Sequence, residues 1–134
     1  MTKKEIDLFL KKPLIAIITT LNQDGTTHMT PVWYLYKSNK IIVASEKTSV
    51  KINNIRKNPN VGICICQSDV SHKYVQASGI AELNTQNIQE IVKEMSVSYK
   101  GKKDGQKYSK DALQKIDFMI IEISPTIIFG ENIA

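Results

Sequence analysis

The chain has 134 residues, 42% of them hydrophobic and 23% charged, which is the composition of an ordinary globular domain with a single core. We expect one domain over residues 1–134 in the cytoplasm, because no apolar run approaches the roughly 20 residues needed to cross a bilayer and the lysine-rich N-terminus lacks the core of a signal peptide. All of the 18 basic residues except Arg56 are lysines, spread along the chain between acids. This distribution favours an anionic small molecule as the binding partner over a nucleic acid.

The first third of the chain predicts a helix followed by a hairpin. Residues 2–11 have the spacing of a short amphipathic helix. Two apolar runs follow, residues 14–20 and 29–36, and the dipeptide Asp24-Gly25 between them suits a tight turn. The two runs are therefore predicted to pair as antiparallel strands.

A short helix is predicted directly after a third strand over residues 40–45. Ile52 and Ile55 are three residues apart, Ser49 is a favourable N-cap, and Pro59 ends the pattern.

The start of this helix is a predicted anion site. The first turn of a helix offers free N–H groups and the positive end of the helix dipole. Hydroxyl and ammonium groups surround it here, on Ser45, Lys47, Thr48, Ser49 and Lys51. A phosphate suits such donors. The alternative is an ordinary capped helix whose lysines are solvated.

The second half of the chain predicts more strands and one long helix. The predicted elements are a strand over residues 61–66, a long strand over 73–83 with a bulge or bend at Gly79, a helix over 87–99, an exposed loop over 100–110 with one helical turn over 109–114, and two strands, 118–123 and 126–129, joined at Ser124-Pro125. We interpret the whole as a mainly β fold, a closed antiparallel barrel of six or seven strands with helices outside it, because closure removes exposed sheet edges.

Cysteine and histidine give no metal site or disulfide. Cys64 and Cys66 lie two apart on one predicted strand, so they share a face, are poor disulfide partners and are expected to be buried. His28 and His72 are isolated in the sequence, so no metal site is expected.

Six spaced motifs occur in an order that is characteristic of one family. They are a strand ending in Thr-Thr-Leu, the Asp-Gly turn, a strand containing Pro-Val-Trp-Tyr, a strand ending in Ala-Ser, the stretch Ser-x-Lys-x-x-Asn-Ile-Arg-x-Asn-Pro, and a strand Val-Gly-Ile-Cys-Ile. From about residue 8 to 82, and more loosely to the C-terminus, this order resembles the pyridoxamine 5′-phosphate oxidase-like family of FMN-binding split barrels. The resemblance implies a split antiparallel β-barrel, and some members use a deazaflavin.

The resemblance implies a phosphorylated cofactor, either FMN or the deazaflavin coenzyme F420. Lys51 would bind the phosphate, aided by Ser45, Thr48 and Ser49. The pocket lining carried over from the family comprises Thr30, Pro31, Val32, Trp33, Val43, Ala44 and Ser45. Trp33 is the only tryptophan, and it either borders the cofactor ring or fills the core.

The resemblance also implies a homodimer with two shared sites. In related proteins a polar side chain from the long strand reaches the cofactor of the other subunit, and Gln76 occupies that position here. The alternative for Gln76 is an ordinary exposed strand residue.

The function that the resemblance implies is an oxidoreductase that passes hydride to or from a small organic substrate. True pyridoxamine phosphate oxidases hold their substrate with a C-terminal Trp and Arg cluster, and this chain has neither residue after Arg56, so vitamin B6 oxidation is not expected. The alternative function is a non-catalytic flavin-binding or storage protein, and a haem-binding relative lacks an obvious axial ligand. Lysines within residues 3–12 and 100–110 could bind the anionic tail of the deazaflavin, which slightly favours that cofactor.

Overall fold

The computed structural model describes residues 1–70 and 72–131, which form seven strands and four helices. In chain order these are α1 (Lys3–Leu10), β1 (Ala16–Leu21), β2 (Thr27–Val32), β3 (Leu35–Lys37), β4 (Lys40–Glu46), α2 (Val50–Lys57), β5 (Asn60–Cys66), β6 (Tyr74–Asn84), α3 (Ile88–Lys100), α4 (Lys102–Lys115) and β7 (Phe118–Glu131). No helix within these ranges is long and apolar enough to span a membrane.

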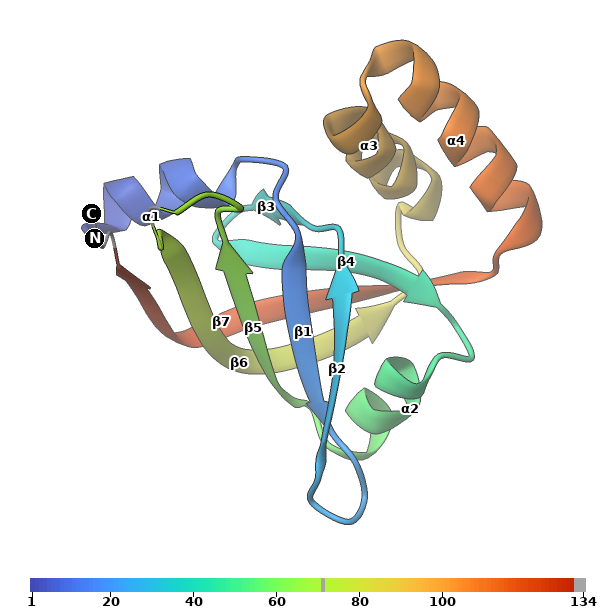
Figure 1. Cartoon of the computed structure of the whole chain (residues 1–134). Coiled ribbons are helices and arrows are strands. Elements are labelled where there is room, and N and C mark those ends of the chain that lie inside the picture. The colour runs from blue at the N-terminus through green and yellow to red at the C-terminus, as the bar shows by residue number, and fades with distance from the viewer. Residues whose placement is uncertain (71, 132–134) are drawn as a thin grey trace.

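All seven strands belong to one antiparallel sheet in the order β2-β1-β5-β6-β7-β4-β3. The sheet curls strongly, so that its two edges approach each other as a split barrel (Figure 1). The predicted split-barrel fold is confirmed, but the prediction of full closure is wrong, because no ladder in the described part of the chain joins β2 to β3 or β4. Residues 33–34 lead directly from one edge strand, β2, to the other, β3.

The core fills the concave side of the sheet. Alternate residues of each strand point inward, among them Ile18, Ile63 and Ile121. Helices α1 and α2 lie at opposite ends of the curled sheet (Figure 1) and contribute buried side chains to the same cluster, including Phe9 and Ile52.

Two predicted strand boundaries are wrong. The predicted strand over residues 29–36 is two strands, because the Tyr34 amide N–H leaves the sheet and donates to the Tyr99 hydroxyl at 3.1 Å. The two predicted C-terminal strands are one strand, β7, which runs through Pro125 without a break. A register shift between Ser78 and Gly79 accommodates this proline, which confirms the predicted bulge at Gly79.

The predicted loop over residues 100–110 is also wrong, since Lys100 ends α3 and α4 begins at Lys102 after the single residue Gly101. The face of α4 that packs on α3 is made of the small residues Gly105, Ser109 and Ala112. A Cβ on Gly105 would lie 2.5 Å from the Val97 Cα, so the absence of a side chain lets the two helices approach closely. Because these buried residues are small, the sequence of α4 lacks the periodic large apolar residues that would have predicted a helix here.

The two cysteines share a strand face as predicted, but they are exposed. The inward positions of β5 are taken by Val61, Ile63 and Ile65, so alternation places Cys64 and Cys66 on the outer surface. The expectation that they are buried is therefore wrong.

Gly79→Ala should destabilise the fold. The added Cβ would collide with the Ser124 carbonyl oxygen at the bulge, and we expect a loss of about 1 to 3 kcal/mol in the free energy of unfolding, measured with urea. Gly62→Ala on β5 is the matched control, because its Cβ would have no neighbour closer than 3.9 Å. Equal stability of the two variants would contradict this account of the bulge.

Candidate functional site

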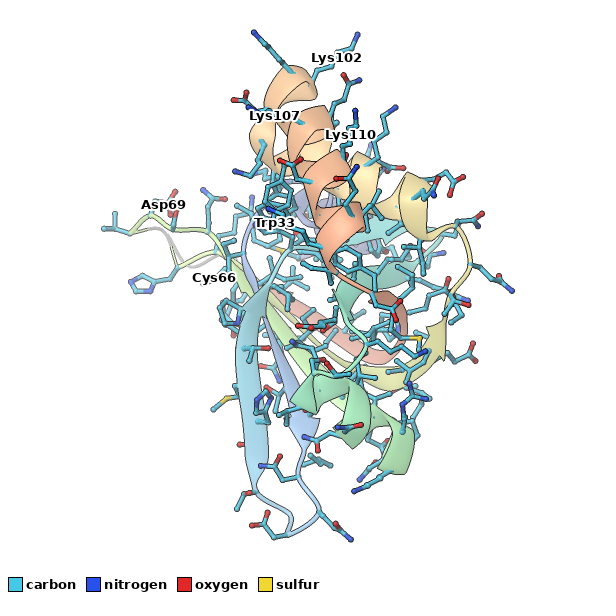
Figure 2. All side chains as sticks on the ribbon, turned by 90° about the vertical axis from the view of Figure 1, so that its right-hand side faces the viewer. Trp33, Cys66, Asp69, Lys102, Lys107 and Lys110 are labelled. Atoms are coloured by element: carbon cyan, nitrogen blue, oxygen red, sulfur yellow. The ribbon has the colours of Figure 1, made fainter. Side chains whose placement is uncertain are left out.

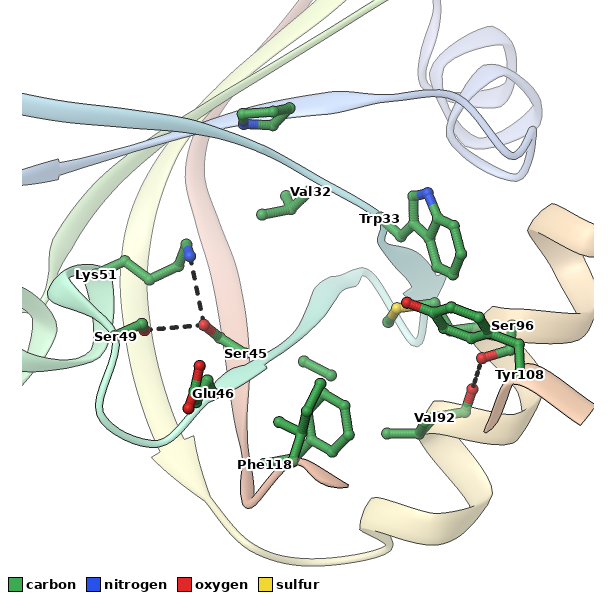
Figure 3. Close-up of a pocket in the computed structure, with 14 residues that line it drawn as sticks. Val32, Trp33, Ser45, Glu46, Ser49, Lys51, Val92, Ser96, Tyr108 and Phe118 are labelled. Atoms are coloured by element: carbon green, nitrogen blue, oxygen red, sulfur yellow. Dashed lines mark hydrogen bonds between the residues drawn. The ribbon is translucent and has the colours of Figure 1, made fainter. Parts of the chain in front are cut away.

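A cavity of about 340 Å³ lies where the split of the barrel meets the α3–α4 hairpin. Strand β2 bounds it on one side and β4 on the other, with the first turn of α2 at one end and the hairpin at the other (Figure 3). Its lining residues are Pro31, Val32, Trp33, Ala44, Ser45, Glu46, Ser49, Lys51, Val92, Met95, Ser96, Tyr108, Ile116 and Phe118.

One end of the cavity carries a cation and two hydroxyls. The Oγ atoms of Ser45 and Ser49 are 2.9 Å apart, and the Lys51 ammonium donates to Ser45 Oγ at 3.4 Å (Figure 3). Ser49 is the N-cap of α2 and accepts from the Ile52 amide, which confirms the predicted cap. The three side chains therefore converge because β4 ends where α2 begins.

Lys51 is a partly buried ammonium, and burial lowers its pKa. None of the ion pairs found in residues 1–70 and 72–131 involves it. Glu46 lines the same cavity as an exposed side chain near Ser45 (Figure 3), but it forms no ion pair with Lys51 among the described residues. An anion at this end would supply Lys51 with the charge partner that the described residues do not.

The other end of the cavity is aromatic. The Trp33 indole stacks on Tyr99 of α3, with ring centroids 4.8 Å apart and planes 8° from parallel. Tyr108 of α4 approaches Trp33 at 5.4 Å with its ring tilted by 51°. Trp33 is half-buried and contributes to both the cavity wall and the small core beneath α3. The core interpretation therefore holds in part, and a place beside a cofactor ring stays a prediction.

Tyr99, on which the Trp33 indole stacks, is held in place by hydrogen bonds of its hydroxyl. Its hydroxyl donates to the Leu14 carbonyl oxygen at 2.6 Å and accepts from the Tyr34 amide at 3.1 Å. Burial raises the pKa of Tyr99. The Tyr99 side chain thus connects α3 to the segment before β1 and to the residues between β2 and β3.

The structure brings seven of the predicted site residues into one cavity wall, namely Pro31, Val32, Trp33, Ala44, Ser45, Ser49 and Lys51. The other four lie elsewhere. Val43 is fully buried in the barrel core and Thr48 is exposed beyond the end of β4. Thr30 lies on the same face of β2 as Val32, and Gln76 is on the outer surface of β6.

The inward face of β2 carries two buried polar atoms without a hydrogen-bond partner, His28 Nδ1 and Thr30 Oγ1. Both side chains share this face with Val32, which lines the cavity. Unpaired buried atoms of this kind are uncommon in folded proteins. Neither residue lines the cavity, so the donor set that fits a phosphorylated cofactor is the one at the Lys51 end.

Sequence reasoning missed the whole wall that the hairpin contributes. These residues are Val92, Met95 and Ser96 of α3, Tyr108 of α4, and Ile116 and Phe118 beyond it. The only sequence signal for α4 is the spacing of its three small buried residues, described above. In the described ranges no three His, Cys, Asp or Glu side chains gather into a group that could hold a metal ion.

Comparisons with known proteins agree with this architecture. A conserved hypothetical protein from Mycobacterium tuberculosis superimposes with a TM-score of 0.85 at 19% identity, covering 98% of this chain and 85% of that one. A structure described as an F420 reductase gives 0.74 at 20% identity, covering 92% and 94%. HutZ, described as the haem storage protein of Vibrio cholerae, gives 0.74 at 14% identity, covering 95% and 92%. At these identities the likeness shows the fold alone.

The family follows from the sequence. A search of curated proteins found no match. The model of the pyridoxamine 5′-phosphate oxidase family matches residues 2–130, nearly the whole chain. This protein belongs to the pyridoxamine 5′-phosphate oxidase family.

Proposed function

We propose that the cavity binds FMN or the deazaflavin coenzyme F420, and that the protein is an oxidoreductase acting on a small organic substrate. The observation that carries this proposal is the pairing of a partly buried, unpaired Lys51 and two serine hydroxyls at one end of a cavity with the Trp33 wall at the other. A phosphorylated tricyclic cofactor would place its phosphate at the Lys51 end and its ring along Val32 and Trp33 on the β2 side, with the α3–α4 wall left for a substrate. Membership of the family supports it.

The residues of this chain would act by binding and positioning. Lys51, Ser45 and Ser49 would hold the phosphate, while Val32 and Trp33 would border the ring. When bound, the cofactor supplies the hydride chemistry. The protein's part is to fix the ring against the β2 wall and to keep water away from it, which the apolar lining favours.

The alternative is a non-catalytic protein that binds or stores the cofactor. Both functions predict the same cofactor binding, and they differ in what happens after reduction. To distinguish them, the bound cofactor is reduced under anaerobic conditions and candidate substrates are added. In an enzyme, one of these compounds reoxidises the bound cofactor faster than it reoxidises free cofactor. The visible spectrum of the purified protein identifies FMN, deazaflavin or haem.

The choice between FMN and the deazaflavin depends on cations for an anionic tail. Lys103, Lys107 and Lys110 lie on the face of α4 opposite Gly105 and Ala112, which pack on α3. Figure 2 shows Lys102, Lys107 and Lys110 extending from this helix into solvent. These lysines would bind the anionic tail of the deazaflavin where it leaves the cavity. Titration with FMN and with the deazaflavin decides between the two cofactors.

We also propose a homodimer in which Gln76 completes the partner's site. Pro31 lines the cavity and starts a cross-strand row on the outer face that continues through Ile17, Cys64 and Gln76. Gln76 is three strands from Pro31, roughly 14 Å at about 4.8 Å per strand, so it cannot reach its own cavity. Exposed apolar side chains occupy this face, namely Ile17, Met29, Ile80, Ile127 and Phe129. A second copy would cover them and present its Gln76.

Lys51→Ala should weaken FMN binding about ten- to hundredfold, measured by absorbance or fluorescence titration. A charge-assisted contact to a phosphate contributes roughly 1.5 to 3 kcal/mol, and about 1.4 kcal/mol corresponds to a factor of ten. Lys47→Ala is the matched control, since Lys47 is exposed and outside the cavity wall.

Riboflavin distinguishes the contribution of the phosphate to binding from that of the ring. It lacks the phosphate, so its affinity should be nearly the same for the wild-type protein and Lys51→Ala. If Lys51→Ala weakens riboflavin as much as FMN, the phosphate is held elsewhere. The fluorescence of Trp33, the only tryptophan, should be quenched by either ligand.

Ile127→Glu should shift the protein from a dimer of about 30 kDa, two copies of the 15.1 kDa chain, to a monomer. Ile127 is 68% exposed on the apolar outer face, and two buried carboxylates without partners would oppose association. Light scattering gives the mass. Leu8→Glu, an equally exposed change on α1, should leave the dimer intact. A wild-type protein that is monomeric at micromolar concentration while binding FMN tightly would rule out the shared site.

A further inference from the structure

The hairpin side of the cavity differs chemically from the Lys51 side. Its wall consists of Val92, Met95 and Ser96 of α3, Tyr108 of α4, and Ile116 and Phe118, and none of these carries a charge. The two charged residues that line the cavity, Glu46 and Lys51, come from β4 and α2 at the opposite end (Figure 3). A charged group placed against the hairpin would lose water without gaining a partner.

Among the described residues that line the hairpin side, Tyr108 alone has a hydroxyl without a protein partner. The Ser96 hydroxyl is buried and donates to the Val92 carbonyl oxygen at 2.7 Å, so it is already paired within α3. The Tyr108 hydroxyl has no hydrogen bond to any residue in the described ranges, and Figure 3 shows it extending from α4 across the cavity. Tyr108 thus offers a flat apolar ring and a single polar group.

Tyr108 is positioned by contacts with Trp33 and Lys100. Its ring packs against Trp33 at 5.4 Å, and the Lys100 ammonium lies over it at 5.0 Å from the centroid. Lys100 is not part of the cavity wall, so its charge contacts the ring and not the cavity contents. Tyr108 is 44% exposed, which means that the barrel core does not depend on it.

We infer that the hairpin end of the cavity is the substrate subsite and that it selects an uncharged, planar aromatic molecule carrying one hydrogen-bond acceptor. The molecule packs between Tyr108 and Phe118, and the Tyr108 hydroxyl donates a hydrogen bond to its acceptor. This inference rests on the proposed function, in which the cofactor is anchored by its phosphate at Lys51. It makes Tyr108 a specificity-determining residue.

An isosteric pair of probes tests the selection for neutral ligands. Naphthalene carboxamide and naphthalene carboxylate have the same shape and differ in charge. Calorimetric titration of the FMN-loaded protein should show the amide binding at least tenfold more tightly than the carboxylate. Equal affinities, or tighter binding of the carboxylate, would overturn the inference.

Variants of Tyr108 test the residue itself. Tyr108→Phe keeps the ring and removes the hydroxyl, so amide affinity should fall about two- to tenfold. Tyr108→Ala removes the wall and should reduce it further. Asp111→Ala, an exposed change on the same helix outside the cavity wall, should change nothing. Unchanged amide affinity in Tyr108→Ala would show that the subsite lies elsewhere, and the urea unfolding midpoint confirms that each variant is folded.

The two proposals fail in different ways. Titration of FMN alone tests the cofactor site. If FMN binds but displaces the amide, the hairpin end holds the cofactor ring and the substrate-subsite inference is wrong. If the protein without FMN still prefers the amide and FMN does not bind, the cavity's selectivity stands and the proposed cofactor is wrong.

Discussion

The ladder between β6 and β7 is the interaction on which the rest of the structure depends. It is the longest pairing in the sheet, running from Tyr74 opposite Glu131 to Asn84 opposite Ile120. Strands β5, β1 and β2 extend from its β6 side, and β4 and β3 from its β7 side. The bulge at Gly79 lies within this ladder, and bulges increase local bend and twist. The curvature of this pair therefore brings the two outer halves of the sheet toward each other.

The candidate site is a direct result of this arrangement. Val32 comes from one half and Ser45 from the other, and they line opposite sides of a gap that no backbone ladder of the described strands closes. Burying the Lys51 ammonium there costs free energy, as its lowered pKa reflects, and no residue in the described ranges offsets that cost with an ion pair. A bound phosphate would do so. Cavities of this kind are stabilised by the ligand they bind.

The features that the sequence predicted correctly depend on neighbouring residues. The Asp24-Gly25 turn forms with Gly25 at φ 86° and the Asp24 carboxylate accepting from the Thr26 amide, and Ser49 caps α2. The family resemblance predicts that Trp33 and Lys51 bind one cofactor; both line the same cavity, and their binding role stays a prediction. Neither the open gap between β2 and β4 nor helix α4 could be predicted from residues that are neighbours in the sequence. The first depends on the total curvature of the sheet, and the second on Gly105 approaching Val97 of another helix. Tyr108 was missed because it lies in a stretch whose lysines indicate a loop.

The α3–α4 hairpin connects two strands that are already adjacent. At its ends Asn84 pairs with Ile120 and Leu83 with Ile121, so a tight turn of a few residues would join β6 to β7 without any change of register. The hairpin can therefore be exchanged, shortened or lengthened without a change of strand register. A replacement would have to restore the hydrogen bonds of Tyr99 to Leu14 and Tyr34 and to cover the small core that Met95 completes. A domain built this way separates the Lys51 half of the site from a half that can be replaced. Grafting another hairpin between Asn84 and Phe118 offers a route to altered ligand preference on the same scaffold.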